Sequence, residues 1–202
     1  MAQVTVYTGT SRSSRGRRID ALLLKNSGST RLIVPTQRGA AHRMRRLVKC
    51  NKSRGFLGRP VLTFEDFASG LLKGTPDDLP LVSQTTQQLL LQGAVENAEA
   101  DGLLAFLGEA AASPGFLHHI QHVITQLKQS AVKPDDFRER VNRRKSSSAF
   151  DSVVAQIYTN YQNALVEAQT FDSQGMYWLA DLTCQYTKPA VLDGISTLLI
   201  DG

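Results

Sequence analysis

The residues with the clearest chemical potential follow Gly9, in a loop of serines and arginines. A Walker A phosphate-binding loop reads G-x-x-x-x-G-K-[ST]. Its glycines admit phosphate to the backbone, its lysine contacts the β- and γ-phosphates, and its hydroxyl binds Mg²⁺. Counted from Gly9, the chain has Ser14 for the second glycine, Arg15 for the lysine and Gly16 for the hydroxyl residue. Together with Ser13, these residues form a predicted nucleotide-binding loop, a P-loop with degenerate chemistry.

These replacements bear directly on catalysis. Arg15 keeps a positive charge, but its broad planar group does not reproduce a compact ammonium inside a tight loop. Gly16 offers no hydroxyl to Mg²⁺. We therefore predict no catalytic residue and no required cofactor, with ATP and Mg²⁺ as the candidates if a nucleotide binds. The alternative is an active NTPase, in which Arg15 or Arg17 replaces the lysine and Ser13 or Ser14 supplies the hydroxyl.

The elements expected to position this loop are a strand before it and a helix after it. Short apolar runs near 4–7, 31–35 and 61–64 read as strands, and an apolar helical stretch covers 19–24. Three strand–loop–helix steps in the first 75 residues favour an α/β fold with a parallel sheet. A loop that joins a strand to a helix is also the setting of a P-loop.

The chain changes character after a linker at 74–80 that is rich in turn-forming residues. Residues 81–188 carry helical apolar repeats, and Asp172 is an expected N-cap within them. Residues 195–202 read as an apolar strand that returns to the sheet, and the sequence stops there. We therefore expect an α/β part in 1–75, a helical insertion in 81–188 and a last strand in 195–202. This ending leads us to interpret the chain as a fragment or a truncated product.

Charge is distributed unevenly along the chain. Residues 1–60 contain fourteen lysines and arginines and one acid, Asp20, which gives a net charge of +13. Residues 61–202 contain nine basic and seventeen acidic residues, a net charge of −8. A block this basic suggests a polyanionic partner, most simply nucleic acid. The alternative is a basic face that packs on an acidic partner subunit.

The basic block includes a predicted helix that begins after an N-cap at Thr36 and continues to about Lys49. One side of this helix is apolar and can pack on a sheet, while the other carries arginines. Guanidinium groups bind phosphate oxygens through paired hydrogen bonds. We therefore predict phosphate contacts at Arg38, Arg43 and Arg46.

Composition excludes several other classes of protein. No apolar run approaches the roughly 18 residues that a transmembrane helix needs, and the N-terminus lacks the pattern of a signal peptide. Cys50 and Cys184 are isolated, which argues against a zinc site or a disulfide framework and fits a reducing cytoplasm. His118 and His122 have the i, i+4 spacing of a metal pair, but no third ligand accompanies them. We expect a cytoplasmic protein without membrane contact.

The order of these segments resembles the N-terminal region of AddB/RexB-type subunits of bacterial helicase–nucleases, relatives of superfamily 1 helicases. The Gly9 loop is similar to that family's phosphate-binding motif. Residues 32–37, 61–68 and 198–202 are similar to its vPxQ segment, its TFxxla segment and its vDGF strand. The resemblance covers almost the whole chain. It implies a RecA-like parallel sheet that is interrupted by a mostly helical insertion.

Three further site residues follow from the resemblance alone. The vPxQ segment is the motif Ia region that touches single-stranded DNA, which implies a DNA contact at Gln37. The same analogy implies a backbone contact at Thr63. Asp201 stands where motors carry Walker B and could orient Mg²⁺. Gly202, however, removes the following carboxylate, which in active motors helps the attacking water.

The expected function is therefore that of a helicase-like scaffold that binds single-stranded DNA and does not hydrolyse ATP. It would belong to an AddB-type subunit that works with a partner helicase–nuclease subunit in the repair of DNA double-strand breaks. The family's nuclease domain has no counterpart here, and two isolated cysteines cannot hold its iron–sulfur cluster. The alternatives are the active NTPase and an assembly module that docks on a partner without binding DNA.

Overall fold

The computed structural model describes residues 12–26, 28–50, 55–56, 58–144 and 148–201, together with Thr5. The chain divides into two compact units. The first, called the sheet unit here, comprises residues 1–75 and 183–202, and the second, the helical unit, comprises residues 76–182. Apart from Thr5, the strand predicted near 4–7 lies outside the described residues, as does Gly9.

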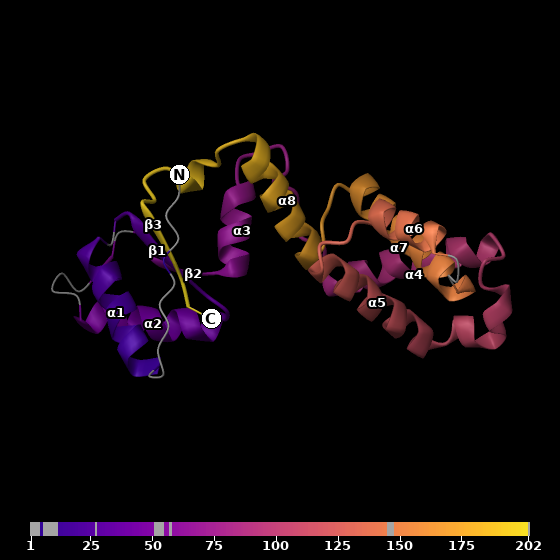
Figure 1. Cartoon of the computed structure of the whole chain (residues 1–202), viewed down its shortest axis with the longest axis horizontal. Coiled ribbons are helices and arrows are strands. Elements are labelled where there is room, and N and C mark those ends of the chain that lie inside the picture. Colours follow the sequence, from indigo (N-terminus) through magenta and orange to yellow (C-terminus); the bar gives the residue numbers. More distant parts are fainter. Residues whose placement is uncertain are drawn as a thin grey trace. The chain divides into compact units, whose positions relative to one another are not determined.

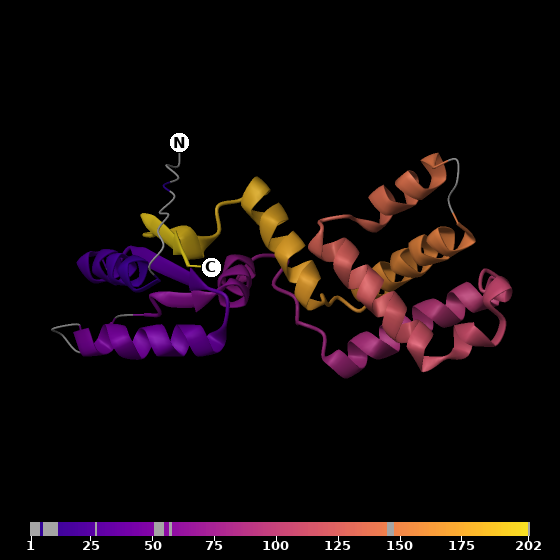
Figure 2. The same cartoon turned by 60° about the horizontal axis from the view of Figure 1, so that its bottom comes forward.

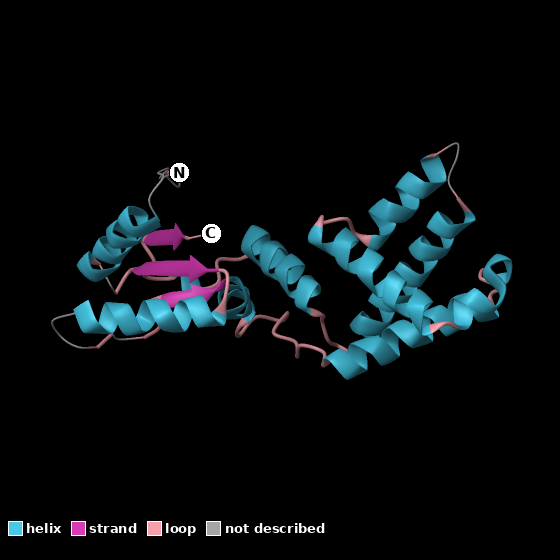
Figure 3. Ribbon diagram, turned by 90° about the horizontal axis from the view of Figure 1, so that it is seen from below, coloured by secondary structure: helices cyan, strands magenta, loops and turns pink. Residues whose placement is uncertain are grey.

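Within the described residues, three strands form one parallel sheet in the order β2-β1-β3. The strands are β1 (Thr30–Val34), β2 (Val61–Thr63) and β3 (Thr197–Ile200). Figure 3 shows them side by side and pointing the same way. Leu32 of β1 is in register with Val61 on one side and with Leu199 on the other. The predicted α/β fold with a parallel sheet is confirmed.

Helices cover both faces of this sheet (Figure 1). They are α1 (Arg12–Lys25), α2 (Gln37–Cys50), α3 (Phe64–Leu72) and the short 3₁₀ helix η2 (Ala190–Leu192). Leu32 and Val34 pack with Leu23 of α1 and Leu47 of α2 in one apolar cluster. Because side chains alternate along a strand, the buried Ile33 points to the opposite face, where α3 lies.

The start of α1 differs from the expectation. The sequence predicts a loop as far as Arg18 and a helix from Ile19, whereas the helix begins at Arg12. Ser14, Arg15 and Gly16 therefore lie in the first turns of α1 and not in a loop. Arginine is a strong helix former, and the cluster of serines and a glycine concealed that preference.

The helical unit packs around its own apolar core (Figure 2). Its helices are α4 (Gln84–Ala100), the 3₁₀ segment η1 (Ala105–Ala112), α5 (Pro114–Gln129), α6 (Pro134–Arg143), α7 (Ala149–Glu167) and the start of α8 (Ser173–Tyr186). The largest buried side chains of this core include Leu91, Ile120, Ile157 and Tyr158. The 3₁₀ segment η1 is kinked at Gly108, whose φ of 53° is not helical.

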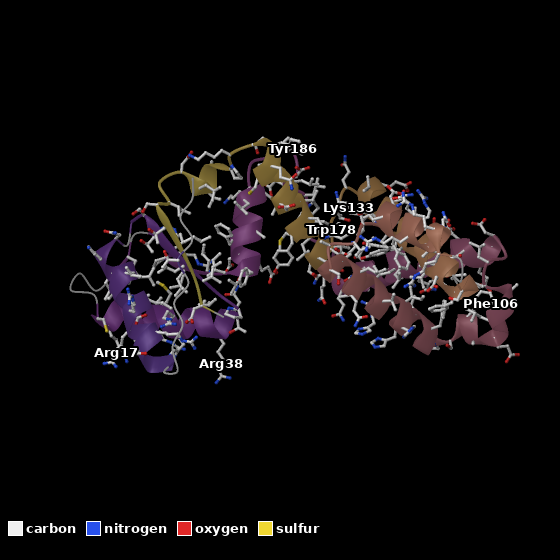
Figure 4. All side chains as sticks on the ribbon, in the orientation of Figure 1. Arg17, Arg38, Phe106, Lys133, Trp178 and Tyr186 are labelled. Carbon is white, nitrogen blue, oxygen red and sulfur yellow. The ribbon has the colours of Figure 1, made fainter. Side chains whose placement is uncertain are left out.

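A buried ion pair fixes the start of α8. Lys128 Nζ lies 2.7 Å from Asp172 Oδ2, and only 1% and 3% of the two side chains are exposed. The same oxygen accepts a hydrogen bond of 2.9 Å from the Tyr161 hydroxyl. The other carboxylate oxygen accepts one of 2.7 Å from the amide of Gly175, which confirms Asp172 as the N-cap of α8. Lys128 Nζ also lies 5.3 Å from the ring centroid of Trp178, a residue labelled in Figure 4.

This burial changes the ionisation of three side chains. Desolvation lowers the pKa of Lys128, although the charge of Asp172 opposes the shift. Burial also raises the pKa of Tyr158 and Tyr161 far above the ordinary phenol value, and the charge of Asp172 adds to the effect. Tyr158 donates its hydroxyl hydrogen to the carbonyl of Val132 at 2.9 Å, so both phenols serve as donors.

We predict that Tyr158 and Tyr161 ionise only when the helical unit opens. A group whose folded pKa is raised stabilises the fold below its unfolded pKa, about 10 for tyrosine. That contribution is lost as the pH rises above this value. Spectrophotometric titration of phenolate should therefore show two of the five tyrosines ionising together with the loss of the circular dichroism signal. Tyr161→Phe should remove one of them. Full phenolate absorbance in a still folded chain would contradict the assignment.

Candidate functional site at the carboxyl edge of the sheet

The parallel strands bring their carboxyl ends to one edge of the sheet (Figure 3). In register, Val34 pairs with Thr63 and Ile33 pairs with Ile200. The residues that follow the strands, Gln37 and Asp201 among them, therefore gather at this edge. Ligands of parallel α/β sheets bind at this end of the strands. Among the described residues, this edge holds two clusters of polar side chains.

The first cluster is built around the guanidinium of Arg43, of which 13% is exposed. Its Nη1 lies 3.2 Å from Asp20 Oδ1, and its Nη2 forms an ion pair with Asp201 Oδ2. Arg46 pairs with the second oxygen of Asp20. We call these four residues the Arg43 network. It ties α1, α2 and the end of β3 together.

Gly16 gives the two arginines of the network room to cross α1. It is buried, and its carbonyl oxygen lies 3.5 Å from Arg43 Nη1. A Cβ at this position would come within 3.2 Å of Arg43 Nη1 and 3.4 Å of Arg46 Nη2. Gly16 therefore serves helix packing here, a role that the Walker A comparison did not suggest. The neighbouring Arg15 has a buried Nε that finds no hydrogen-bond partner among the described residues.

The second cluster joins α2 to the start of α3. Gln37 Nε2 donates to Thr63 Oγ1 at 3.3 Å and to Asp66 Oδ2 at 3.1 Å. Thr63 and Asp66 also form a capping box, in which each side chain accepts the other's amide hydrogen. Partial burial raises the pKa of Asp66, but hydrogen bonds from Thr63 and Gln37, with the charge of Arg59, hold it below its ordinary value. Sequence reasoning missed Asp66 and Arg59, although the spacing T-x-x-D is a capping signal.

The remaining predicted residues lie around these clusters. Arg38 is exposed in the first turn of α2, and Figure 4 shows it pointing away from the sheet. Thr36 is the N-cap of this helix, as predicted, because its hydroxyl accepts the amide hydrogen of Gly39 at 3.0 Å. Gly9 and the side chain of Ser13 lie outside the described residues, and Ser14 is exposed on α1.

The comparison with known families identifies the chain's relatives. The family described as "ADDB, N-terminal" matches residues 13–183. The chain belongs to this AddB N-terminal family. A search of curated proteins found no match. Membership in the AddB family implies a subunit of a helicase–nuclease complex with a partner subunit, which is consistent with a role in DNA repair.

Two described residues of this edge, Gly16 and Asp201, do not suit a magnesium site. Gly16 occupies the position of the Mg²⁺-binding hydroxyl and packs under arginine side chains. The carboxylate of Asp201 is already paired with Arg43.

His118 and His122 belong to no group of three metal-ligating side chains in the part of the chain that the structure describes. No described helix is long and apolar enough to cross a membrane.

We predict that Asp20→Asn lowers the free energy of unfolding by about 2 kcal/mol, because it leaves the mostly buried Arg43 with a single carboxylate partner. Urea unfolding measures the loss, and hydrogen exchange in β1 and β3 assigns it to the sheet unit.

Asp193→Asn is the matched control for this change. Asp193 pairs with Lys188 in the same unit, but both side chains are about two-thirds or more exposed. This substitution should change stability by no more than about 0.5 kcal/mol. Equal losses in the two variants would show that the Arg43 network contributes no more than a surface ion pair.

Proposed function

We propose that this chain is a scaffold that binds single-stranded DNA within an AddB-type helicase–nuclease subunit and does not hydrolyse ATP. Its place would be in double-strand-break repair, beside a partner subunit. The observation that carries the proposal is the pair of exposed arginines on α2, next to the carboxyl edge of the sheet. Family membership supports the cellular role, and the chemistry of the edge supports the scaffold role.

The arginines of α2 fall into two groups. Arg43 and Arg46 are neutralised inside the Arg43 network. Arg38 and Arg45 are exposed and form no ion pair within the described ranges. They are seven residues apart, which places them on one face of the helix. A phosphate backbone could bind along this face without opening any internal contact.

The helix ends at this edge add to the attraction for phosphates. Neither α1 nor α2 has an acidic residue in its first turn. The amide groups at a helix N-terminus carry a partial positive charge, and an acid there would offset it. Arg17, exposed on α1 and labelled in Figure 4, extends the basic surface. These features support binding of a polyanion and require no nucleotide.

Gln37 and Thr63 have a positioning role in this proposal. Both the hydroxyl and the amide of Thr63 are engaged by Asp66, and Gln37 bonds to the same two residues. They hold the starts of α2 and α3 together and so set the place of Arg38. We therefore propose Arg38 as the first phosphate contact, and Arg43 and Arg46 as contacts that need the network to open.

The double variant Arg38→Ala with Arg45→Ala tests this function. We expect weaker binding of a fluorescein-labelled oligothymidylate, and a log–log salt slope shallower by about 0.7 for each phosphate contact removed. The matched control is Lys25→Ala with Lys49→Ala. These lysines end α1 and α2 at the opposite edge and are also exposed. The control should keep the affinity and the slope of the parent chain.

Three outcomes would contradict the proposal. Equal losses in both double variants would show a diffuse attraction and no site at this edge. Absence of any salt-sensitive affinity, together with co-purification of a partner subunit, would select the assembly module. ATP turnover that is lost in Arg15→Ala would select the active NTPase.

A further inference from the structure

The helical unit contains a pocket that the proposed function does not use. It has a volume of about 460 Å³ and lies among the end of α5, α6 and the start of α7. Leu127, Val132, Phe137 and Val141 give it an apolar lining. This volume lies within the range of about 300–1,000 Å³ that is typical of ligand sites.

The walls of the pocket are fixed by the fold. Leu127 and Phe137 pack against the core of the helical unit. The backbone of Val132 is held on both sides, because its amide donates to the carbonyl of Leu127 at 2.9 Å and its carbonyl accepts the hydroxyl hydrogen of Tyr158 at 2.9 Å. A pocket with fixed walls loses little conformational entropy when it is filled.

Arginines also contribute to this pocket. Arg140, Arg143 and Arg144 line it, and each of them is exposed. Arg143 pairs with Glu139, whereas Arg140 and Arg144 form no ion pair with any described residue. Among the described residues of the lining the one acid is Asp151, which forms the capping box at the start of α7 with Ser148.

This positive charge is unusual for its part of the chain. Residues 61–202 carry a net charge of −8, yet five of their nine basic residues fall within positions 138–145. Three of these five, Arg140, Arg143 and Arg144, line the apolar pocket. Charge and apolar surface at one place suit a ligand that carries carboxylates next to a bulky apolar group.

We propose that this pocket binds a short acidic peptide segment of a protein partner, with one bulky apolar side chain in the pocket and flanking carboxylates on Arg140 and Arg144. An anchor side chain in a desolvated pocket supplies most of the affinity of such contacts. Guanidinium groups at the rim select carboxylates through paired hydrogen bonds. Nucleic acid fits less well, because phosphate contacts would leave the apolar floor empty. The site lies in the helical unit and does not depend on the DNA-binding proposal.

Peptide variants on the unaltered chain give the first test. The probe is a fluorescein-labelled peptide of sequence Asp-Asp-Asp-Leu-Phe, and its binding is followed by fluorescence anisotropy. We expect saturable binding that weakens at least about tenfold when Leu-Phe becomes Ser-Ser, since the bulky apolar side chain in the pocket is lost. Replacing the aspartates by asparagines should weaken it at least about threefold, as expected for exposed ion pairs. Because the protein is unchanged, loss of folding cannot explain either result.

Charge reversal on the protein gives the second test. Arg140→Glu and Arg144→Glu should each weaken binding of the same probe at least about threefold. Arg138→Glu is the matched control, because Arg138 is an exposed arginine of α6 that does not line the pocket. It should keep the parent affinity within about twofold.

The proposal is overturned by any of three results. The first is an affinity for the peptide that does not change when Leu-Phe is replaced by Ser-Ser. The second is a loss of affinity in the Arg138→Glu control equal to that in Arg140→Glu and Arg144→Glu. The third is a chain that does not bind the probe but binds an oligothymidylate that Arg140→Glu and Arg144→Glu weaken. That result would make the arginines a second nucleic-acid surface.

Discussion

The guanidinium of Arg43 lies between two carboxylates that come from opposite ends of the chain, Asp20 and Asp201. A mostly buried cation requires compensation by charge and hydrogen bonds, since desolvation is costly. Neither carboxylate can be supplied by residues next to Arg43 in sequence. Arg43 therefore has both of its ion pairs only when the chain has returned from the helical unit and β3 has paired with β1. The placement of α1 and α2 depends on the same contact.

This constraint also separates two roles among the basic residues. The residues that look most like an ATP site, Gly16 and Asp201, are occupied by arginine side chains from α2. A charge neutralised inside the fold cannot attract a distant phosphate, because the paired charges cancel in the external field. In the proposed function, contact with a polyanion therefore falls to cations that form no ion pair among the described residues, such as Arg38 and Arg45. Under the proposed function, the high positive charge of the first block would support both folding and binding, through different residues.

Local chemistry made much of the fold predictable from the sequence. Apolar runs located three strands, and the caps at Thr36 and Asp172 were visible because capping depends on neighbouring residues. The partners of Arg43 were not visible, since they lie 23 and 158 residues away. The burial of Lys128 was hidden for the same reason, because Asp172 is 44 residues distant. Hydrophobic periodicity identifies a core, but it carries no information on which charges meet across it.

In both units, an ion pair between an aspartate and a mostly buried cation holds the segment that leads from the helical unit back to the sheet. Asp172 caps α8 and pairs with the buried Lys128, and Asp201 follows β3 and pairs with Arg43. A shift of Asp172 would leave the buried Lys128 without its carboxylate, and a shift of Asp201 would leave Arg43 with Asp20 alone. The segment from α8 to β3 is therefore anchored by a carboxylate at each end. Its first anchor lies inside the helical unit and its second at the carboxyl edge of the sheet, where the exposed arginines of α2 stand.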